Sequence, residues 1–316
     1  MRILVTGVAG FVGSHLAEQL LADGHQVVGL DSFTDYYPRP IKERNLTGLL
    51  ETDGFTFHEL DLRFDSLGPA VEGVEVIINQ AAMAGLMRSW TDFESYASCN
   101  LMGLQRLIEA AQPSNVRRFV QISTSSVYGA NAVGDEDVPT RPVSPYGVTK
   151  LAAEKLLLAH VAIHGFPATI LRYFSIYGPR QRPDMAYSIF TEALMDGRPI
   201  TVFGDGSQSR SNTFVSDAVA ATISAIERAE VGGIYNIGGG EEIILMDAIR
   251  LIADELGVEP QVRYEPARPG DQRRTAADIR LARDVLDYRP RVTPGQGLPA
   301  QVRWQAGLRS SMPSGA

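Results

Sequence analysis

A tyrosine and a lysine four residues apart suggest the first chemistry in this sequence. Tyr146 and Lys150 follow Pro142 and Pro145 and lead into a strong helix-forming stretch, residues 151–158. On a helix, positions four apart share a face. A phenol titrates near pH ~10 in water, and a fixed ammonium nearby favours the phenolate and lowers that pKa. The pair predicts a general base for a hydroxyl proton; the alternative is an ordinary surface helix with a stray tyrosine.

A run of hydroxyl side chains precedes this pair. Residues 118–122 have the pattern of a buried strand, and Ser123, Thr124, Ser125 and Ser126 come directly after it. Ligands of open α/β sheets bind at the carboxyl ends of the strands. We therefore expect this run to face a ligand.

A nucleotide-binding signature opens the chain. Gly7, Gly10 and Gly13 stand where a buried strand turns into a helix. The first permits the tight turn, the second lets a pyrophosphate approach the backbone, and the third permits close helix–strand packing. The helix N-terminus then faces the phosphates. A second strand, residues 26–30, ends at Asp31, which can accept both ribose hydroxyls of NAD; the alternative is a turn aspartate.

Strands and helices alternate through the first half of the chain. Residues 55–60, 74–79 and 168–174 are strand-like, and Asn100 opens an amphipathic helix over residues 101–111. This alternation predicts an α/β fold with a doubly wound parallel Rossmann sheet, NAD at its carboxyl ends, and a smaller C-terminal substrate-binding α/β domain.

Two short loops after these strands are expected to touch the cofactor. Asp61 and Leu62 are placed to meet the adenine. Ala81 and Ala82 are small enough to let a cofactor lie against a strand end.

Composition narrows the class of protein. The chain has 316 residues, 44% hydrophobic and 21% charged, which suits a soluble globular enzyme. No apolar run reaches the ~18 residues of a membrane span, and the N-terminus lacks a signal-peptide layout. The net charge of −8 argues against nucleic acid as partner, so an anionic substrate must meet a local cluster of arginines. The lone Cys99, expected as a buried small side chain, suits a reducing cytoplasm.

With these residues in place, the chain closely resembles the extended short-chain dehydrogenase/reductase family of sugar-nucleotide enzymes. The resemblance covers nearly the whole chain and implies NAD that stays bound and acts catalytically. It implies Tyr146 as the base, Lys150 as the residue that holds the nicotinamide ribose and tunes Tyr146, and Thr124 as the partner of the reacting hydroxyl. It is carried by residues 6–13, Asp31, Asp61, Leu62, Ala81, Ala82, 123–129, Tyr146, Lys150, 172–174, 177–179, 203–206 and 268–271.

Departures from the family pattern narrow the reaction. Family dehydratases carry Asp-Glu after the threonine to expel water, whereas this chain has Ser125 and Ser126. Family decarboxylases place a Glu two residues after the tyrosine, where this chain has Val148. What remains is oxidation and re-reduction at one carbon, which is C4 epimerisation through a 4-keto intermediate. A non-enzymatic NAD-binding sensor would have no need of Thr124, Tyr146 and Lys150 together.

The second half of the chain indicates an acidic sugar. Galactose-type 4-epimerases usually have Asn where Ser175 stands, and Arg182 followed by Pro-Asp-Met-Ala looks like UDP-glucuronate 4-epimerases. A guanidinium matches a carboxylate bidentately, so Arg182 is the candidate partner of the C6 carboxylate. The alternative for Arg182 is a loop ion pair with Asp184.

The resemblance also implies how the nucleotide is held. Arg210 and Arg268 stand where the family grips the UDP diphosphate; the alternative is surface charge. Residues 203–210 resemble hexose-type epimerases as much as uronate ones. We therefore expect conversion of UDP-glucuronate to UDP-galacturonate, with a UDP-glucose/UDP-galactose 4-epimerase as the alternative.

These predictions define an organisation and a site. The NAD-binding domain takes residues 1–174 plus 216–237, the nucleotide-sugar-binding domain 175–215 plus 238–309, and 310–316 form a disordered tail. The family usually dimerises through helices near 101–111 and 151–164, which implies a homodimer. Predicted cofactor contacts are Gly7, Gly10, Phe11, Val12, Gly13, Asp31, Asp61, Leu62, Ala81, Ala82, Asn100, Ser123, Tyr146, Lys150 and Tyr173. Predicted substrate contacts are Thr124, Ser125, Ser126, Tyr146, Ser175, Arg182, Phe203, Arg210 and Arg268, and no metal is expected.

Overall fold

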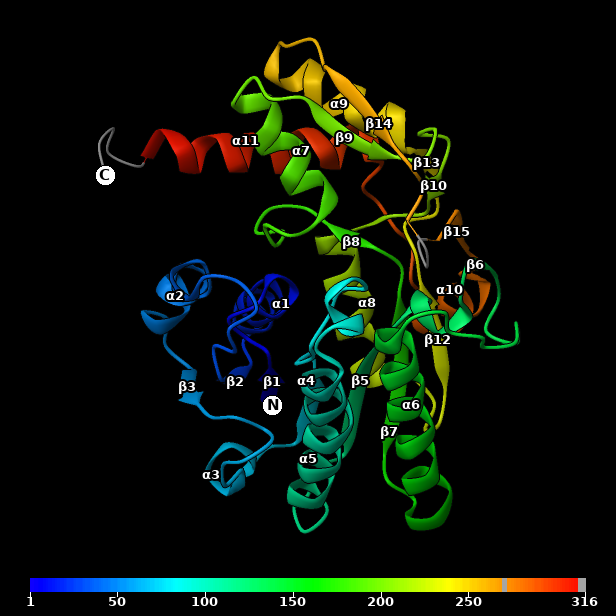
Figure 1. The fold of residues 1–316 in the computed structure, drawn as a ribbon. Coiled ribbons are helices and arrows are strands. Elements are labelled where there is room, and N and C mark those ends of the chain that lie inside the picture. The colour runs from blue at the N-terminus through cyan, green and yellow to red at the C-terminus, as the bar shows by residue number, and fades with distance from the viewer. Residues whose placement is uncertain (269–271, 312–316) are drawn as a thin grey trace.

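Seven parallel strands form the central sheet of the computed structural model, which describes residues 1–268 and 272–311. The chain enters at β1 in the middle of the order β3-β2-β1-β4-β5-β7-β12, and every neighbouring pair is parallel (Figure 1). The predicted doubly wound Rossmann sheet is therefore confirmed. Its strands are β1 Arg2–Thr6, β2 Gln26–Asp31, β3 Phe55–Glu59, β4 Val76–Asn79, β5 Arg118–Thr124, β7 Ala168–Tyr173 and β12 Ile234–Ile237.

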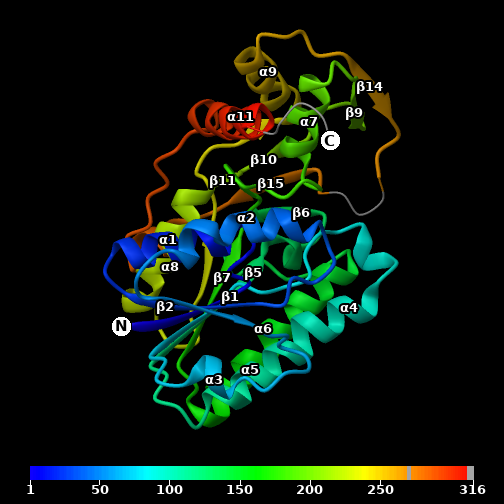
Figure 2. The same cartoon turned by 90° about the vertical axis from the view of Figure 1, so that its left-hand side faces the viewer.

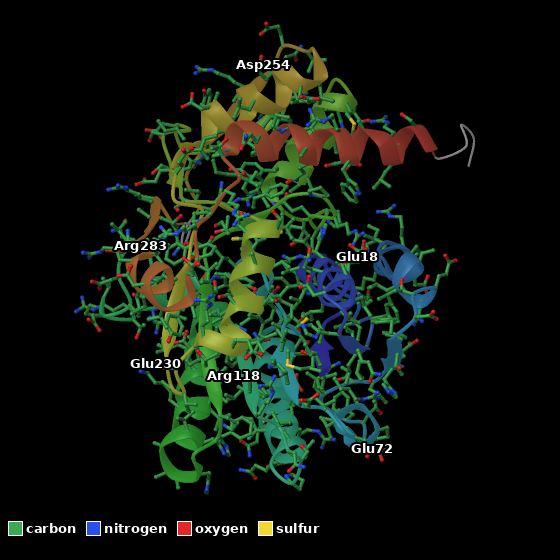
Figure 3. All side chains as sticks on the ribbon, turned by 180° about the vertical axis from the view of Figure 1, so that it is seen from behind. Glu18, Glu72, Arg118, Glu230, Asp254 and Arg283 are labelled. Carbon is green, nitrogen blue, oxygen red and sulfur yellow. The ribbon has the colours of Figure 1, made fainter. Side chains whose placement is uncertain are left out.

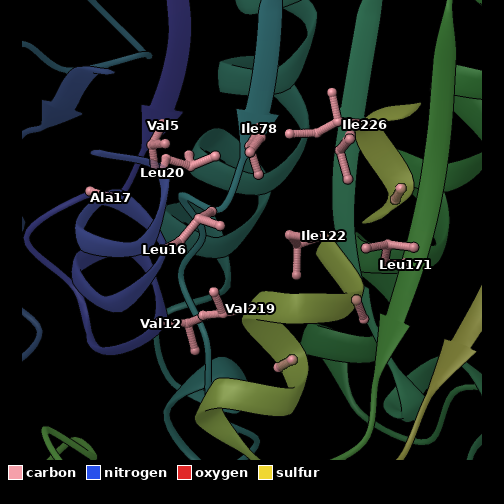
Figure 4. Close-up of a cluster of buried hydrophobic side chains, with 14 of the residues drawn as sticks. Val5, Val12, Leu16, Ala17, Leu20, Ile78, Ile122, Leu171, Val219 and Ile226 are labelled. Carbon is pink, nitrogen blue, oxygen red and sulfur yellow. The ribbon is translucent and has the colours of Figure 1, made fainter. Parts of the chain in front are cut away.

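Helices cover both faces of this sheet, as a buried parallel sheet requires. Side chains of β1, β4, β5 and β7 pack on one face against α1 (Phe11–Ala22) and α8 (Val215–Arg228), for example Val5, Leu16 and Val219 (Figure 4). The same core takes in Leu46 of α2 (Arg39–Leu50). The opposite face packs against α3 (Gly68–Val71), α5 (Gly103–Ala111) and α6 (Pro145–His164). Each fully buried leucine or valine contributes about 1.5–3 kcal/mol of transfer free energy.

A smaller α/β part with its own core lies at the carboxyl-end side of the sheet (Figure 2). In it, α7 (Ala186–Met195), α9 (Leu245–Leu256) and α11 (Pro294–Ser311) pack together beside the parallel pair β9 (Ile200–Phe203) and β14 (Val262–Glu265). Two small sheets lie between the parts. The first has four strands in the order β13 (Ile243–Ile244), β10 (Ser209–Arg210), β15 (Arg274–Ala277) and β6 (Asn131–Gly134). The second pairs β8 (Ile176–Tyr177) with β11 (Thr213–Phe214).

The chain crosses the predicted domain boundaries in two places. Strand β6 belongs by sequence to the first domain but pairs with β15. Helix α10 (Arg280–Leu286) belongs by sequence to the second, yet its Ala282 and Leu286 join the core beneath the central sheet. Both exchanges arise from contacts between distant segments, which local patterns do not encode.

Two further expectations are wrong in detail. Helix α11 continues to Ser311, so the predicted tail is helical at its start, and residues 312–316 lie outside the described residues. Asn100 does not open a helix, because α4 (Phe93–Ala97), the π-helical segment η2 (Ser98–Met102) and α5 follow one another without a break.

Charged side chains gather on the outside. Glu72, Glu230 and Arg283 are exposed and lie at the periphery (Figure 3). Within the described residues, no helix combines the length and the apolar character that crossing a membrane demands.

Candidate functional site

The glycine turn forms one end of a cavity of about 800 Å³. Gly7 follows β1 with a φ of +68°, a left-handed conformation that favours glycine. A Cβ on Gly13 would lie 2.2 Å from the carbonyl oxygen of Gly7, and one on Gly10 would lie 3.0 Å from the same atom. Glycine therefore brings the N-terminus of α1 close to the strand end. This is the arrangement in which a helix N-terminus holds a diphosphate.

Asp31 lies at the next strand end and also lines the cavity. Its carboxylate accepts the N–H of Ala9 at 3.1 Å and the N–H of Phe33 at 2.9 Å. Burial raises the pKa of Asp31, while the Phe33 N–H and the Lys42 ammonium act in the opposite direction. The side chain is thus fixed in place at the cavity wall, and its contact with a ribose stays a prediction.

Asp61 and Leu62, which were predicted to meet the adenine, line the same cavity, as do Ala81 and Ala82. A Cβ on Gly7 would lie 2.9 Å from the Cα of Ala81, so the two segments touch. Cys99 lines the cavity and is half-buried, which differs from the fully buried position expected for it.

The hydroxyl run lies where β5 ends. Ser123, Thr124, Ser125 and Ser126 all line the cavity, so the sequence prediction that they face a ligand site agrees with their position. The Thr124 hydroxyl accepts the N–H of Ser126 at 3.2 Å. This bond begins the short helix η3 (Ser125–Tyr128) and fixes Thr124 at the strand end.

Tyr146 and Lys150 reach the same cavity from the first turns of α6. Ser144 caps this helix by accepting the N–H of Gly147 at 3.1 Å. Burial raises the pKa of Tyr146, while a hydrogen bond with Thr124 and the charge of Arg182 act in the opposite direction. Tyr146 and Thr124 therefore form one hydrogen-bonded pair.

Lys150 makes a main-chain contact that the sequence reasoning did not anticipate. Its Nζ donates to the carbonyl oxygen of Ile122 at 2.6 Å, and burial lowers its pKa to about 8 against the charge of Glu154. The Arg182 charge favours the Tyr146 phenolate. The Lys150 ammonium is held on the main chain of β5 by the Ile122 carbonyl.

A buried ion pair that the sequence reasoning missed lies behind Lys150. Arg172 and Glu154 form a bidentate pair, with 2.7 Å between Nη2 and Oε2, and their side chains are 3% and 1% exposed. Ser123 donates to Glu154 at 2.5 Å, and Arg172 donates to the Tyr128 hydroxyl at 2.8 Å. A charged residue inside an otherwise apolar strand was the available signal.

Asn100 is not among the residues that line the cavity, although it was predicted to contact the cofactor. It is buried, and its amide accepts the N–H of Met83 at 2.8 Å and donates to the Met83 carbonyl at 3.0 Å. Met83 does line the cavity. The Asn100 side chain thus holds the Met83 main chain in place without lining the cavity itself.

The substrate side brings together most of the predicted residues. Tyr173, Ser175, Arg182, Arg210 and Arg268 line the cavity. Ser175 has a φ of +36°, a strained conformation of the kind that clusters at functional sites.

Phe203 does not line the cavity but lies under Arg268, whose guanidinium carbon is 3.4 Å from the ring centroid. Phe203 therefore supports Arg268, which lines the cavity. The rest of the predicted Arg268 motif, residues 269–271, lies outside the described residues.

Arg182 forms the ion pair named as its alternative and also lines the cavity, while its contact with a substrate carboxylate stays a prediction. It lines the cavity, and it also forms a bidentate pair with Asp184, with 2.9 Å from Nε to Oδ1 and from Nη2 to Oδ2. Its guanidinium lies over the Tyr36 ring, 5.2 Å from the centroid.

Charge in the cavity opposes the charge of the chain. Among the described lining residues, seven carry a cation, namely Lys42, Arg63, Arg88, Lys150, Arg182, Arg210 and Arg268. Three carry a carboxylate, namely Asp31, Asp61 and Asp184. This local excess of four positive charges suits an anionic ligand on a chain of net charge −8.

Known proteins match this chain over almost its whole length. The model of the NAD dependent epimerase/dehydratase family matches residues 3–238. A UDP-glucuronate 4-epimerase of Thermodesulfobacterium geofontis is 34% identical, over 95% of either chain. An uncharacterised UDP-glucose epimerase of Bacillus subtilis is 40% identical, over 98% of this chain and 99% of its own. The crystal structure of a UDP-glucuronic acid 4-epimerase from Bacillus cereus with UDP-glucuronic acid and NAD superposes with a TM-score of 0.95. It is 38% identical and covers 98% of this chain and 100% of its own.

Proposed function

We propose that this chain, which belongs to the NAD dependent epimerase/dehydratase family, interconverts UDP-glucuronate and UDP-galacturonate by epimerisation at C4. The observation that carries the proposal is that Tyr146, Thr124 and Arg182 line one cavity. The first two are suited to a hydroxyl group and the third to a carboxylate.

NAD fits the residues present. Side chains at the three glycines would fill the space beside the α1 N-terminus, and Asp31 is held by backbone N–H groups at a ribose position. Gly7, Gly10, Gly13 and Asp31 would hold the diphosphate and adenosine, and Lys150 the nicotinamide ribose. When bound, NAD supplies reversible two-electron oxidation at the sugar carbon.

The chain's own residues handle the proton and the position of the sugar. Tyr146 takes the proton of the 4-hydroxyl and later returns it, and Thr124 orients that hydroxyl. Ser125 and Ser126 supply hydrogen bonds but no acid–base pair for expelling water. Because positions 125 and 126 carry no carboxylic acid, dehydration is disfavoured and the sugar keeps all its oxygens.

Three arginines position the anionic groups of the substrate. Arg210 and Arg268 lie on β10 and beside β14, in the smaller part of the molecule, and are assigned to the diphosphate of UDP. Arg182 is assigned to the C6 carboxylate. A 4-keto uronate is a β-keto acid, and holding its carboxylate away from the perpendicular geometry slows the loss of CO₂.

The same proposal extends to assembly and location. We infer a homodimer through the outer faces of η2, α5 and α6, which expose Met102, Val148 and Ile163 by 57%, 47% and 75%. The lone Cys99 supports a cytoplasmic location. Sedimentation of the purified chain tests the dimer.

The function is tested by incubating the purified chain with UDP-glucuronate and with UDP-glucose and identifying the products by NMR. We expect UDP-galacturonate from the first. In Tyr146→Phe, we expect kcat to fall by about 10²–10⁴, because the proton has no acceptor, while circular dichroism stays unchanged. Turnover of UDP-glucose alone would favour the alternative hexose epimerase. Near-wild-type turnover by Tyr146→Phe would exclude this base.

A further inference from the structure

We propose that Asp184 is a specificity-determining residue that pairs with Arg182 whenever the sugar is neutral, so that the same cavity also epimerises a UDP-hexose such as UDP-glucose. This inference rests on the proposed function and adds a second substrate class to it.

The geometry of the pair is that of a guanidinium holding a bound carboxylate. Two parallel hydrogen bonds of 2.9 Å join the Nε and Nη2 of Arg182 to the two oxygens of Asp184. The Tyr36 hydroxyl donates to Asp184 Oδ2 at 3.4 Å, and the Arg182 guanidinium lies over the Tyr36 ring. Asp184 thus already occupies the bidentate position that a uronate would seek.

The two partners differ in exposure. The Arg182 side chain is 19% exposed and that of Asp184 is 37% exposed. Breaking the pair therefore leaves a carboxylate that water can reach and a guanidinium that it reaches much less. A substrate carboxylate can replace Asp184 on Arg182, because the displaced acid is rehydrated. A neutral hydroxymethyl group cannot balance the guanidinium, so Asp184 must stay paired when a hexose is bound.

Removing the Asp184 charge should therefore affect the two sugars differently. In Asp184→Asn, a bound hexose leaves Arg182 without a counter-charge, whereas a bound uronate supplies its own. We expect kcat/KM for UDP-glucose to fall by about tenfold or more, with kcat/KM for UDP-glucuronate unchanged or raised. The specificity ratio then shifts at least tenfold toward the uronate. A merely structural role for Asp184 would lower both values together.

Two further variants make the experiment decisive. Arg88 and Asp92 form a similar pair at 3.1 Å, with Arg88 also over the Tyr36 ring. Asp92 does not line the cavity, so Asp92→Asn is the matched control and should leave the ratio unchanged. Arg182→Leu removes the partner of the uronate carboxylate and should shift the ratio the other way, with a larger loss on the uronate than on the hexose. It serves as the second probe if Asp184→Asn fails to fold.

The measurements are made on NAD-loaded enzyme with both sugars. Turnover of UDP-glucuronate but not of UDP-glucose by the wild type overturns this inference and leaves the proposed function standing. Equal losses on both sugars in Asp184→Asn also overturn it, because Asp184 would then only orient Arg182. Turnover of neither sugar by the wild type overturns the proposed function and this inference together.

Discussion

Replacing Glu154 by Gln should move the alkaline limit of activity to lower pH. Lys150 and Glu154 lie one turn apart on α6, and both are buried. Burial lowers the pKa of Lys150 to about 8, and the Glu154 charge opposes this. Taking away that charge lowers the pKa of Lys150 further. Since the ammonium is the form assigned to holding the ribose, activity should be lost at a lower pH as the solution becomes more alkaline.

The size of the effect follows from Coulomb's law. Side chains one helical turn apart are separated by about 6 Å, and at an effective dielectric constant of about 20 the attraction is roughly 332/(20 × 6), or about 3 kcal/mol. That is an upper limit of about two pH units. Lys150 and Glu154 form no direct ion pair, because both oxygens of Glu154 accept hydrogen bonds from Arg172 at 3.0 and 2.7 Å, so the attraction lies below this limit. We expect the alkaline limb of kcat/KM to move by about one pH unit.

The assay is the pH profile of kcat/KM on NAD-loaded enzyme, measured from pH 6 to about 10 so that it covers the acidic and the alkaline limb. The control is Glu18→Gln, which breaks the Arg180–Glu18 pair of 2.6 Å at a distance from Lys150. It should leave the limb in place. Glu154→Gln should also lower the free energy of unfolding by about 3–5 kcal/mol, because Arg172 stays buried without its partner. A destabilised variant whose alkaline limb stays where the wild type has it would refute the electrostatic reasoning.

Two more substitutions test the walls of the cavity. Gly13→Ala places a Cβ 2.2 Å from the Gly7 carbonyl oxygen, so we expect about 1–3 kcal/mol of destabilisation in thermal denaturation and loss of the co-purifying NAD, measured by absorbance. The control is Gly48→Ala, whose Cβ would meet nothing within 4 Å and which should keep the stability and the bound NAD. Asn100→Ala leaves the N–H and carbonyl of Met83 without their partner, so we expect about 1–3 kcal/mol of destabilisation in urea unfolding; an unchanged midpoint would count against its supporting role.

The elements that sequence predicted well are those specified by neighbouring residues. The turn at Gly7 needs a left-handed φ, and the close approach at Gly13 excludes any Cβ, so the residue types reveal the geometry. Tyr146 and Lys150 share a face because helical spacing dictates it. These features require nothing from distant parts of the chain.

What sequence could not supply depends on contacts between distant segments. Glu154 lies on α6 and Arg172 on β7, and nothing in either local pattern reveals that they meet. The pairing of β6 with β15 joins residues more than a hundred positions apart, so no local pattern indicates that β6 pairs outside the predicted NAD-binding segment. Asn100 was predicted to contact the cofactor, whereas its amide is bonded to the main chain of Met83, a contact between segments that local pattern does not reveal.

Lys150 and Arg182, two of the cations assigned to ligand groups, differ in how their charge is balanced, and this difference follows from burial. The Glu154–Arg172 pair beside Lys150 is 1% and 3% exposed, so water cannot replace either partner and the carboxylate is a permanent part of the electrostatics. Asp184 is 37% exposed, so solvent can accept its charge when another carboxylate takes its place. A fixed counter-charge suits a residue that must hold the same cofactor in every turnover. An exchangeable one suits a residue that meets substrates of different charge, which is why the Asp184 substitution should change substrate preference while the Glu154 substitution should change the pH profile.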